Sequence, residues 1–319
     1  MKVSELIMTT GGKTGFSFEV LPPLKGKNIE HLYSNIDALK EFNPLYINIT
    51  THRSELVFKS TADGLFQRVS ERSRPGTVAV AAAIQQKYGI PAVPHMICSG
   101  FSRNETEHAL IDLNFLGINN VLVLRGDKAK HENRFIPNEN GHMFANELAE
   151  QINRFNEGFF VDGTPIDGAN KNKFSYGVAG YPEKHEEAPN LEIDIKMLKM
   201  KVDMGADYIV TQMFFDNQKY IDFVERCRQI GINVPIIPAI KPIVNRNQVT
   251  LLPKVFHVDL PTELANELSK CKDDKQAKQV GVEWCKYQAK DLIKLGVPSI
   301  HFYSHNATES VRQVAFDIY

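Results

Sequence analysis

The stretch KVDMGADYIVTQMF, residues 201–214, contains the pattern that decides the fold class of this chain. A helix ending at Gly205 fits it, because glycine is the residue that most easily takes the left-handed position that closes a helix. Ala206 can then pack back on the last turn, and the apolar run 208–214 reads as a strand. The same turn recurs at Gly89-Ile90, Gly117-Ile118, Gly231-Ile232 and Gly296-Val297. These turns predict a chain in which helices alternate with strands.

Eight segments are predicted to be strands, since each is rich in β-branched and aromatic residues and is bounded by turn residues. They are residues 16–21, 45–50, 92–98, 120–124, 174–179, 208–214, 235–240 and 299–303. Most are continuously apolar, which is typical of parallel strands buried on both faces. Apolar residues at three- and four-residue spacing, such as Leu191, Ile195, Leu198 and Val202, indicate helices between them. A last helix is expected over residues 308–316.

This alternation predicts an α/β protein, a single (β/α)8 TIM barrel spanning residues 1–319 as one domain. A barrel of this type usually takes about 250 residues. The surplus falls in two insertions, residues 128–173 after the fourth strand and 256–275 before the last helix–strand unit. An open doubly wound sheet needs the same alternation, but no Gly-x-Gly-x-x-Gly motif follows the first strand, and the barrel is therefore favoured.

Composition narrows the kind of partner. The chain has 37 Lys plus Arg against 38 Asp plus Glu, a net charge of -1, so no global basic field would hold nucleic acid or an anionic membrane. No apolar run of about 18 residues and no apolar secretory core is present, which predicts a cytoplasmic protein. The four cysteines share no Cys-x-x-Cys spacing, and the sequence contains no cluster of Cys and His residues that would suggest a metal site. We expect small-molecule substrates and no bound metal.

Polar residues at the carboxyl ends of barrel strands are the candidates for chemistry. A carboxyl group inside an apolar run holds its proton to higher pH than one in water, so Glu19 could donate a proton near neutral pH; a structural ion pair with Lys or Arg is the alternative. Gln212, in another apolar run, could bind a heterocycle edge or the neighbouring backbone. Asp127 could equally cap a turn, and His95 could be a core histidine.

Taken together, several segments resemble the methylenetetrahydrofolate reductase family almost from end to end. Each fragment alone is weak, but in this order, each at a strand end or a helix start, they are specific. The matching stretches are Phe16-Ser17-Phe18-Glu19 with Pro22-Pro23, Pro94-His95 with Cys98, Leu124-Arg125-Gly126-Asp127, Val178-Ala179-Gly180-Tyr181-Pro182-Glu183 with His185 and Ala188, Lys201-Val202-Asp203 with Gly205-Ala206, Thr211-Gln212 with Phe214-Phe215-Asp216, and His301-Phe302-Tyr303.

The resemblance implies a TIM barrel that binds FAD non-covalently and acts as an oxidoreductase on CH–NH groups. NADH or NADPH would reduce the flavin, which would then pass a hydride to 5,10-methylenetetrahydrofolate in a ping-pong cycle. The product, 5-methyltetrahydrofolate, feeds methionine synthesis. Relatives also imply a homo-oligomer. The absent dinucleotide motif is then explained, because nicotinamide and folate would use the flavin face in turn.

The same resemblance assigns roles to individual residues. Glu19 resembles the general acid that helps open the five-membered ring of the folate to an iminium ion. Asp127 resembles the acidic residue beside flavin and pterin, whose charge favours that cation. Gln212 resembles the amide that binds folate. The positions resembling FAD contacts are Thr50, His95, Leu124, Arg125, Gly126, Asp127, Ala179, Tyr181, His185, Asp194 and Lys201.

The chain also departs from the family pattern. Met200 stands where many relatives have a basic residue, and a family aromatic is replaced near Leu252. The last strand gives Tyr303-Ser304-His305-Asn306 instead of the commoner Tyr-Thr-Leu-Asn, and the 128–173 connection is long. Two other functions stay open from the sequence, a pterin-binding barrel that transfers a methyl group and a non-catalytic subunit that binds flavin or folate.

Overall fold

A computed structural model of the chain describes residues 1–129, 132–167, 172–305 and 307–319. These residues form two compact units. The first unit comprises Met1–Val20, Tyr33–Asn48 and Ser175–Tyr319, and the second comprises Leu21–Leu32 and Ile49–Phe174.

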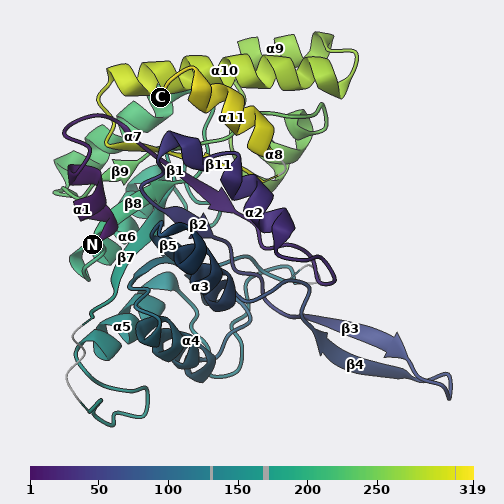
Figure 1. Cartoon of the computed structure of the whole chain (residues 1–319), viewed down its shortest axis with the longest axis vertical. Coiled ribbons are helices and arrows are strands. Elements are labelled where there is room, and N and C mark those ends of the chain that lie inside the picture. Colours follow the sequence, from purple (N-terminus) through teal and green to yellow (C-terminus); the bar gives the residue numbers. More distant parts are fainter. Residues whose placement is uncertain (130–131, 168–171, 306) are drawn as a thin grey trace. The chain divides into compact units, whose positions relative to one another are not determined.

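The first unit contains both ends of the chain and six elements of the main sheet, three from each end of its strand order (Figure 1). They are β1 (Gly15–Val20), β7 (Ser175–Gly180), β8 (Tyr208–Thr211), β9 (Ile236–Ile237), β10 (Ala239–Ile240) and β11 (Ser299–Tyr303). The pairs β1–β11, β10–β11, β7–β8 and β8–β9 are all parallel. These strands are almost entirely buried, as continuously apolar parallel strands should be.

The two terminal elements of the sheet, β9 and β10, are one strand interrupted at Pro238. Ile236 pairs with Ile209 of β8, and Ala239 pairs with His301 of β11. Proline has no N–H to give to a ladder, so it interrupts a strand. Its carbonyl still accepts a hydrogen bond from the backbone N–H of His301 at 2.9 Å. The sheet therefore closes on itself at this strand.

The second unit contains β5 (Ala92–Ile97) and β6 (Asn120–Leu124), which pair in parallel with His95 opposite Leu122. It also contains an antiparallel hairpin of β3 (Glu55–Ser60) and β4 (Phe66–Glu71) (Figure 1). Phe58 and Phe66 on this hairpin are exposed. The hairpin was not predicted, because its short apolar run Leu56-Val57-Phe58 stands among polar and charged residues.

Within the described residues, the main sheet has nine strands in the order β10-β11-β1-β2-β5-β6-β7-β8-β9, with β2 at Ile47–Ile49. With β9 and β10 counted as one interrupted strand, the eight predicted strands are the eight observed. Their order follows the sequence around the barrel. The predicted (β/α)8 TIM-type fold is confirmed.

The glycine turns quoted above take the predicted conformation. Gly89, Gly117, Gly205, Gly231 and Gly296 all have positive φ, from 65° at Gly89 to 115° at Gly205. The apolar residue after the glycine is buried at four of the five turns, namely Ile118, Ala206, Ile232 and Val297. Each of these turns thus ends a helix and delivers the chain to the next strand.

Helices alternate with the strands. In the second unit they are α3 (Thr77–Tyr88), α4 (Arg103–Phe115) and α5 (Ala145–Asn156), which lies in the predicted 128–173 insertion. The remaining helices are α1 (Val3–Met8), α2 (Glu30–Asp37), η1 (Lys40–Phe42), α6 (Leu191–Asp203), α7 (Asn217–Gln229), α8 (Gln248–Phe256), α9 (Thr262–Lys270), α10 (Asp274–Lys294) and α11 (Thr308–Phe316). The last helix has the bounds predicted from the sequence. Among the described helices, none combines the length and the apolar character that crossing a membrane requires.

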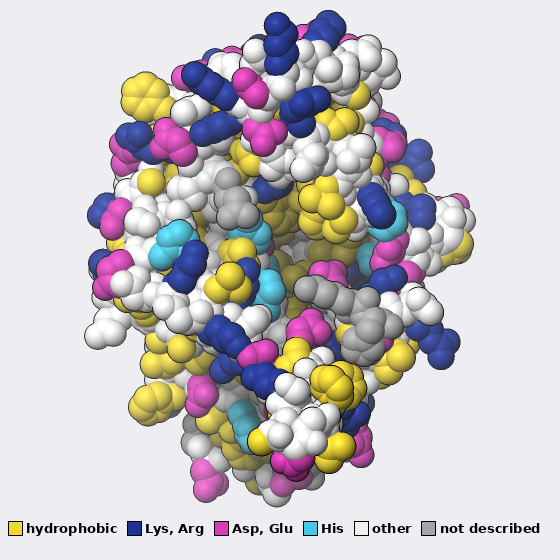
Figure 2. Space-filling view, turned by 90° about the vertical axis from the view of Figure 1, so that its right-hand side faces the viewer, with side chains coloured by type: hydrophobic (Ala, Val, Ile, Leu, Met, Phe, Trp, Pro, Cys, Tyr) yellow, Lys and Arg dark blue, Asp and Glu magenta, His cyan; other side chains and the backbone are white. Residues whose placement is uncertain are grey.

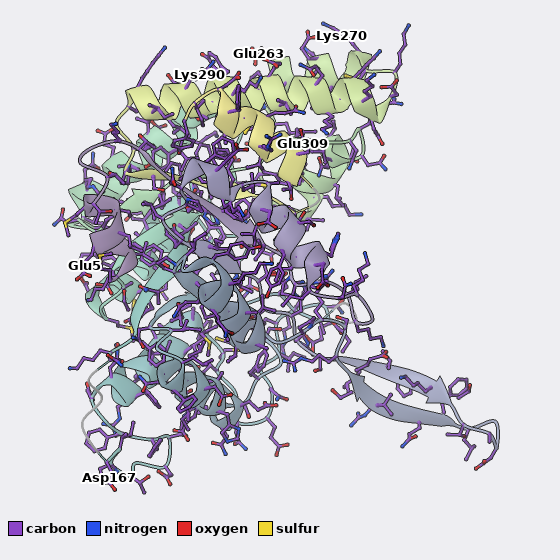
Figure 3. All side chains as sticks on the ribbon, viewed as in Figure 1. Glu5, Asp167, Glu263, Lys270, Lys290 and Glu309 are labelled. Carbon is purple, nitrogen blue, oxygen red and sulfur yellow. The ribbon has the colours of Figure 1, made fainter. Side chains whose placement is uncertain are left out.

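The predicted 256–275 insertion contains α9, which packs with α8 and α10 around a small apolar cluster of the first unit. Glu263 and Lys270 on α9 and Lys290 on α10 point away from the ribbon (Figure 3). At Gly281, a Cβ atom would lie 2.0 Å from the carbonyl oxygen of Ile243. Glycine is therefore required where α10 passes over the segment that follows β10.

The surface carries both signs of charge. Figure 2 shows Lys and Arg side chains mixed with Asp and Glu side chains over the visible face. This mixture agrees with the net charge of -1. A charged ligand would therefore be attracted by individual side chains near its site and not by the net charge of the chain.

Candidate active site

Glu19 is the penultimate residue of β1 and lies opposite Tyr303 in the β1–β11 ladder. Its side chain is 7% exposed. One carboxylate oxygen, Oε1, is 2.9 Å from Nε2 of His305, close enough for an ion pair although the alignment is not that of a hydrogen bond. Its backbone carbonyl accepts a hydrogen bond from Ser304 Oγ at 2.6 Å. The candidate acid is thus buried at a strand end, beside a histidine that follows the last strand.

Two further groups of the first unit influence this carboxylate. Lys241 follows β10, is 8% exposed, and donates from Nζ to the carbonyl oxygen of His305 at 3.2 Å. Burial lowers the pKa of Lys241, and the negative charge of Glu19 partly offsets this effect. Tyr303 donates its hydroxyl proton to the carbonyl oxygen of Thr211 at 3.0 Å, and burial, with the charge of Glu19, holds its pKa well above 10. Tyr303 therefore stays neutral.

Gln212 directly follows β8 and is half-buried. Its backbone N–H donates to the carbonyl oxygen of Gly180 at 2.7 Å. Its side-chain oxygen accepts from the backbone N–H of Met213 at 2.8 Å, so the structure shows the contact with neighbouring backbone that the sequence left open. A bidentate contact with a heterocycle would have to break this hydrogen bond.

The loop after β7 brings five predicted cofactor residues of the first unit together. The rings of Tyr181 and His185 meet edge to face, 4.8 Å between centroids. Asp194, in the first turn of α6, accepts from the backbone N–H of His185 at 2.8 Å. Lys201, further along α6, donates from Nζ to the carbonyl oxygen of Ala179 at 3.3 Å. Burial lowers the pKa of Lys201 to about 8, an effect that Asp194 partly offsets.

Glu183 in the same loop is a group that the sequence analysis did not single out. Its Oε2 accepts from the backbone N–H of Asp259 at 2.8 Å. Burial raises the pKa of Glu183 to about 7, and the hydrogen bond from Asp259 opposes that rise. Glu186, three residues on, lies 2.7 Å from His257. These contacts tie the loop after β7 to the segment after α8.

In the second unit, Thr50 follows β2 and His95 lies in β5. His95 is 5% exposed. Its backbone carbonyl accepts a hydrogen bond from Thr51 Oγ1 at 2.5 Å. The hydroxyl of Thr50 is buried and has no partner within the described residues. Such an orphaned hydroxyl fits a site that a ligand completes.

The predicted segment Leu124–Asp127 follows the end of β6. Gly126 has φ +80°, and a Cβ atom there would lie 2.9 Å from Cβ of Ser99, so glycine is required. Ser99 donates from Oγ to the carbonyl oxygen of Asp127 at 2.6 Å, which fixes this turn. The Asp127 side chain is exposed. The guanidinium of Arg125 lies 4.9 Å from the ring centroid of Phe135, a cation–π contact with the 128–173 segment.

These features fit the flavin nucleotide that the resemblance implies. In the first unit the buried ammonium group of Lys201 suits a phosphate. In the second unit the guanidinium group of Arg125 is a further cation, and the Thr50 hydroxyl needs a partner. Within the described residues, no group of three or more His, Cys, Asp and Glu is placed to hold a metal ion. Burial raises the pKa of Cys98 to about 12, so this thiol is not a nucleophile at neutral pH.

Two residues beside Glu19 received no role from the sequence. Lys241 was missed, and a lysine directly after a buried strand is the signal that would have found it. His305 was noted only as a departure from the family pattern. The remaining site predictions lie at strand ends or the adjoining loops and helix, and their roles stay predictions.

The fold and these strand-end groups define a TIM-type barrel enzyme scaffold with a buried acid at the end of β1. Residues 3–318 match the family model described as methylenetetrahydrofolate reductase. The chain belongs to the methylenetetrahydrofolate reductase family.

Individual relatives agree with this assignment. The chain is 33% identical to "Methylenetetrahydrofolate reductase (NADH) 1" of Arabidopsis thaliana over 97% of its length and 49% of that protein. It is 29% identical to the "5,10-methylenetetrahydrofolate reductase" of Escherichia coli, over 93% of this chain and 88% of that protein. The chain thus spans about half the length of the plant relatives and most of the bacterial one.

A solved structure from Clostridium thermocellum has a similar fold, with a TM-score of 0.57 at 14% sequence identity. The alignment covers 99% of this chain and 98% of that one, which is described as binding two copies of 5-methyl-5,6,7,8-tetrahydrofolic acid. At this identity the likeness concerns the fold alone.

Proposed function

We propose that this chain reduces 5,10-methylenetetrahydrofolate to 5-methyltetrahydrofolate, with FAD as cofactor and NADH or NADPH as the electron donor. The observation that carries the proposal is the buried Glu19 at the end of β1, flanked by His305 and Lys241, in a chain of this family. Residues 1–319 would act as one catalytic domain in a ping-pong cycle whose product feeds methionine synthesis.

Residues from several strand ends would hold the FAD, which when bound supplies the redox chemistry. Lys201 would neutralise the charge of the diphosphate, because its ammonium group is buried and the negative charge of Asp194 offsets only part of the cost of that burial. The unpartnered hydroxyl of Thr50 would gain a hydrogen bond. The full set proposed is Thr50, His95, Leu124, Arg125, Gly126, Asp127, Ala179, Tyr181, His185, Asp194 and Lys201.

Glu19 would act as the general acid. In its protonated form the carboxyl group transfers its proton to a ring nitrogen of the folate, the adjacent carbon–nitrogen bond breaks, and the one-carbon unit becomes an iminium cation. The carboxylate left behind is stabilised by Lys241 and by His305 at 2.9 Å. General acid catalysis of this kind contributes about 10²- to 10⁴-fold in rate.

Two other side chains would act on the folate. Asp127 is exposed at the end of the β6 turn, and a carboxylate beside the iminium cation would favour its formation. Gln212 would donate from Nε2 to the folate, since its side-chain oxygen is occupied by Met213 N–H. These two groups would thus stabilise charge and set orientation.

Anaerobic half-reactions of the Glu19→Gln variant test this proposal. Flavin bleaching by NADH or NADPH should persist, because that half needs no ring opening. Recovery of colour with methylenetetrahydrofolate should slow by about 10²-fold or more. Glu263→Gln, on the outer side of α9, is the control and should match the parent. Full folate reduction by the Glu19 variant would refute the general-acid role.

The same experiment separates the two rival functions. A purified protein without yellow flavin absorbance would favour the methyl-transferring pterin barrel. Flavin that neither nucleotide reduces would favour a subunit that receives electrons from another protein.

A further inference from the structure

A cavity of about 440 Å³ lies within the second unit, and its lining includes none of the candidate site residues described above. It lies between α4 and α5, which are tied together by a hydrogen bond from Gln151 Nε2 to the carbonyl oxygen of Arg103 at 2.8 Å. The strap 159–161 closes one side, and Val161 donates its backbone N–H to Glu107. Part of the predicted 128–173 insertion therefore builds this cavity.

His142 is the most buried charged or polar residue in the lining, at 3% exposed. Because Gln151 gives its Nε2 to Arg103, its Oε1 must face His142, whose Nε2 lies 2.5 Å away. That nitrogen consequently carries the imidazole proton. Burial lowers the pKa of His142, with Arg103 acting in the same direction and Gln151, Glu147 and Glu150 opposing it. A neutral His142 thus presents Nδ1 as an acceptor.

Nδ1 of His142 is buried and has no hydrogen-bond partner within the described residues. Its nearest recorded charged neighbour is Oε2 of Glu147 at 4.0 Å, an oxygen that already accepts the backbone N–H of Met143 at 2.7 Å. A carboxylate has lone pairs for further hydrogen bonds, so Glu147 and His142 Nδ1 can still share one donor group between them. Glu150 adds a second carboxylate to the lining. This end of the cavity favours an ammonium group.

The lining also has a positive and an apolar part. Arg103 lies at the start of α4, and its guanidinium has no ion-pair partner within the described residues. Arg154, by contrast, stacks on the ring of Phe159 at 4.7 Å. Phe155 and Phe160 complete an aromatic wall, their ring centroids 6.3 Å apart. One cavity therefore offers acceptors, a free cation and an apolar surface.

We propose that this cavity binds a free α-amino acid with an apolar side chain. The ammonium group binds His142 Nδ1 and the carboxylates of Glu147 and Glu150, and the α-carboxylate binds the Arg103 guanidinium. The apolar side chain packs against Phe155 and Phe160. A simple amine would make no use of Arg103, and a simple carboxylate would leave His142 Nδ1 without a donor and lie beside the like charges of Glu147 and Glu150.

Titration calorimetry on the full chain tests the proposal, with L-leucine and L-phenylalanine as probes. The matched analogues 2-phenylethylamine and 3-phenylpropanoate each lack one charge of phenylalanine, and each should bind at least tenfold more weakly than the amino acid. Arg103→Gln and Glu150→Gln should weaken binding by a similar factor. Both side chains are exposed on helices, so these variants should fold, and circular dichroism checks this.

Glu139→Gln, in the exposed loop before Gly141, is the control and should bind like the parent. Binding should also weaken as the pH falls and His142 becomes protonated, because Nδ1 then turns into a donor. Absence of heat with both amino acids at millimolar concentration would overturn the proposal. So would equal affinity for phenylalanine and 2-phenylethylamine, or unchanged affinity in the folded Arg103 and Glu150 variants.

Discussion

Replacing His305 with leucine, the residue that commoner family sequences have there, should change the pH dependence of the folate half-reaction. In this structure Nε2 of His305 lies 2.9 Å from Glu19 Oε1, and the Glu19 side chain is only 7% exposed. When it is protonated, the histidine favours the carboxylate over the carboxyl form. Without it, Glu19 should keep its proton to higher pH.

The structure sets the size of this effect. An opposite charge within about 4–6 Å shifts a carboxyl pKa by about 1–3 units. The 2.9 Å pair lacks the alignment of a hydrogen bond, so the lower end of this range applies. The alkaline limb of the profile should therefore move up by about one unit, which corresponds to about 1.4 kcal/mol. Lys241 remains in place and limits the change.

The assay is the rate of colour recovery by methylenetetrahydrofolate after anaerobic flavin reduction, measured from pH 6 to pH 10. The matched control is His257→Asn, which breaks the pair of His257 with Glu186 at 2.7 Å. Both of those side chains are over 40% exposed, so solvent screens the pair and the limb should stay in place. An unmoved or lowered limb in His305→Leu would refute the role assigned to His305.

Three further predictions concern stability and cofactor binding. Lys201→Met should weaken FAD binding about tenfold at pH 7, measured by flavin fluorescence, and the FAD affinity of the parent should fall as pH rises through about 8. An undiminished FAD affinity in the variant would contradict the diphosphate role of Lys201. Gly281→Ala should lower the unfolding free energy, measured in urea, by about 1–3 kcal/mol, because the clash with Ile243 outweighs the gain in helix propensity. A stabilised variant would show instead that α10 can shift to avoid the clash. Burial raises the pKa of Glu183 from 4.5 to about 7 in the folded protein, so the unfolding free energy should fall as pH rises between these values. Glu183→Gln should remove this pH dependence and be about 1–3 kcal/mol more stable than the parent above pH 7. Equal unfolding free energies of the parent at pH 5 and pH 8, measured in urea, would contradict the prediction.

Local patterns in the sequence were sufficient for most of the fold. The glycine turns predicted where helices end, since positive φ at a helix terminus is a local requirement that few other residues satisfy. Strand 235–240 was placed correctly, but its division into β9 and β10 at Pro238 was not foreseen. The hairpin of β3 and β4 was not predicted because most of its residues are polar or charged and exposed to solvent.

The candidate site was only partly predictable. Glu19 and Gln212 could be singled out because a polar residue in an apolar run is conspicuous in any sequence, and their roles stay predictions. The contact that Gln212 makes with Met213 could not be chosen over a ligand contact, because both satisfy the same amide oxygen. Lys241 was missed because nothing local distinguishes a buried lysine after a strand from an exposed one.

The sequence by itself determined the alternation of helices and strands, the positions of the turns and the residue types at the strand ends, because periodicity and glycine conformation act over a few residues. Only the tertiary structure decided which distant groups share an environment. Pairing of β1 with β11 brings His305 to Glu19, and the β10–β11 pair places Lys241 beside both. Likewise, the free acceptor on His142 follows from a chain of contacts through Gln151 to Arg103. Such electrostatic environments depend on burial and on neighbours far apart in the chain, which no local pattern encodes.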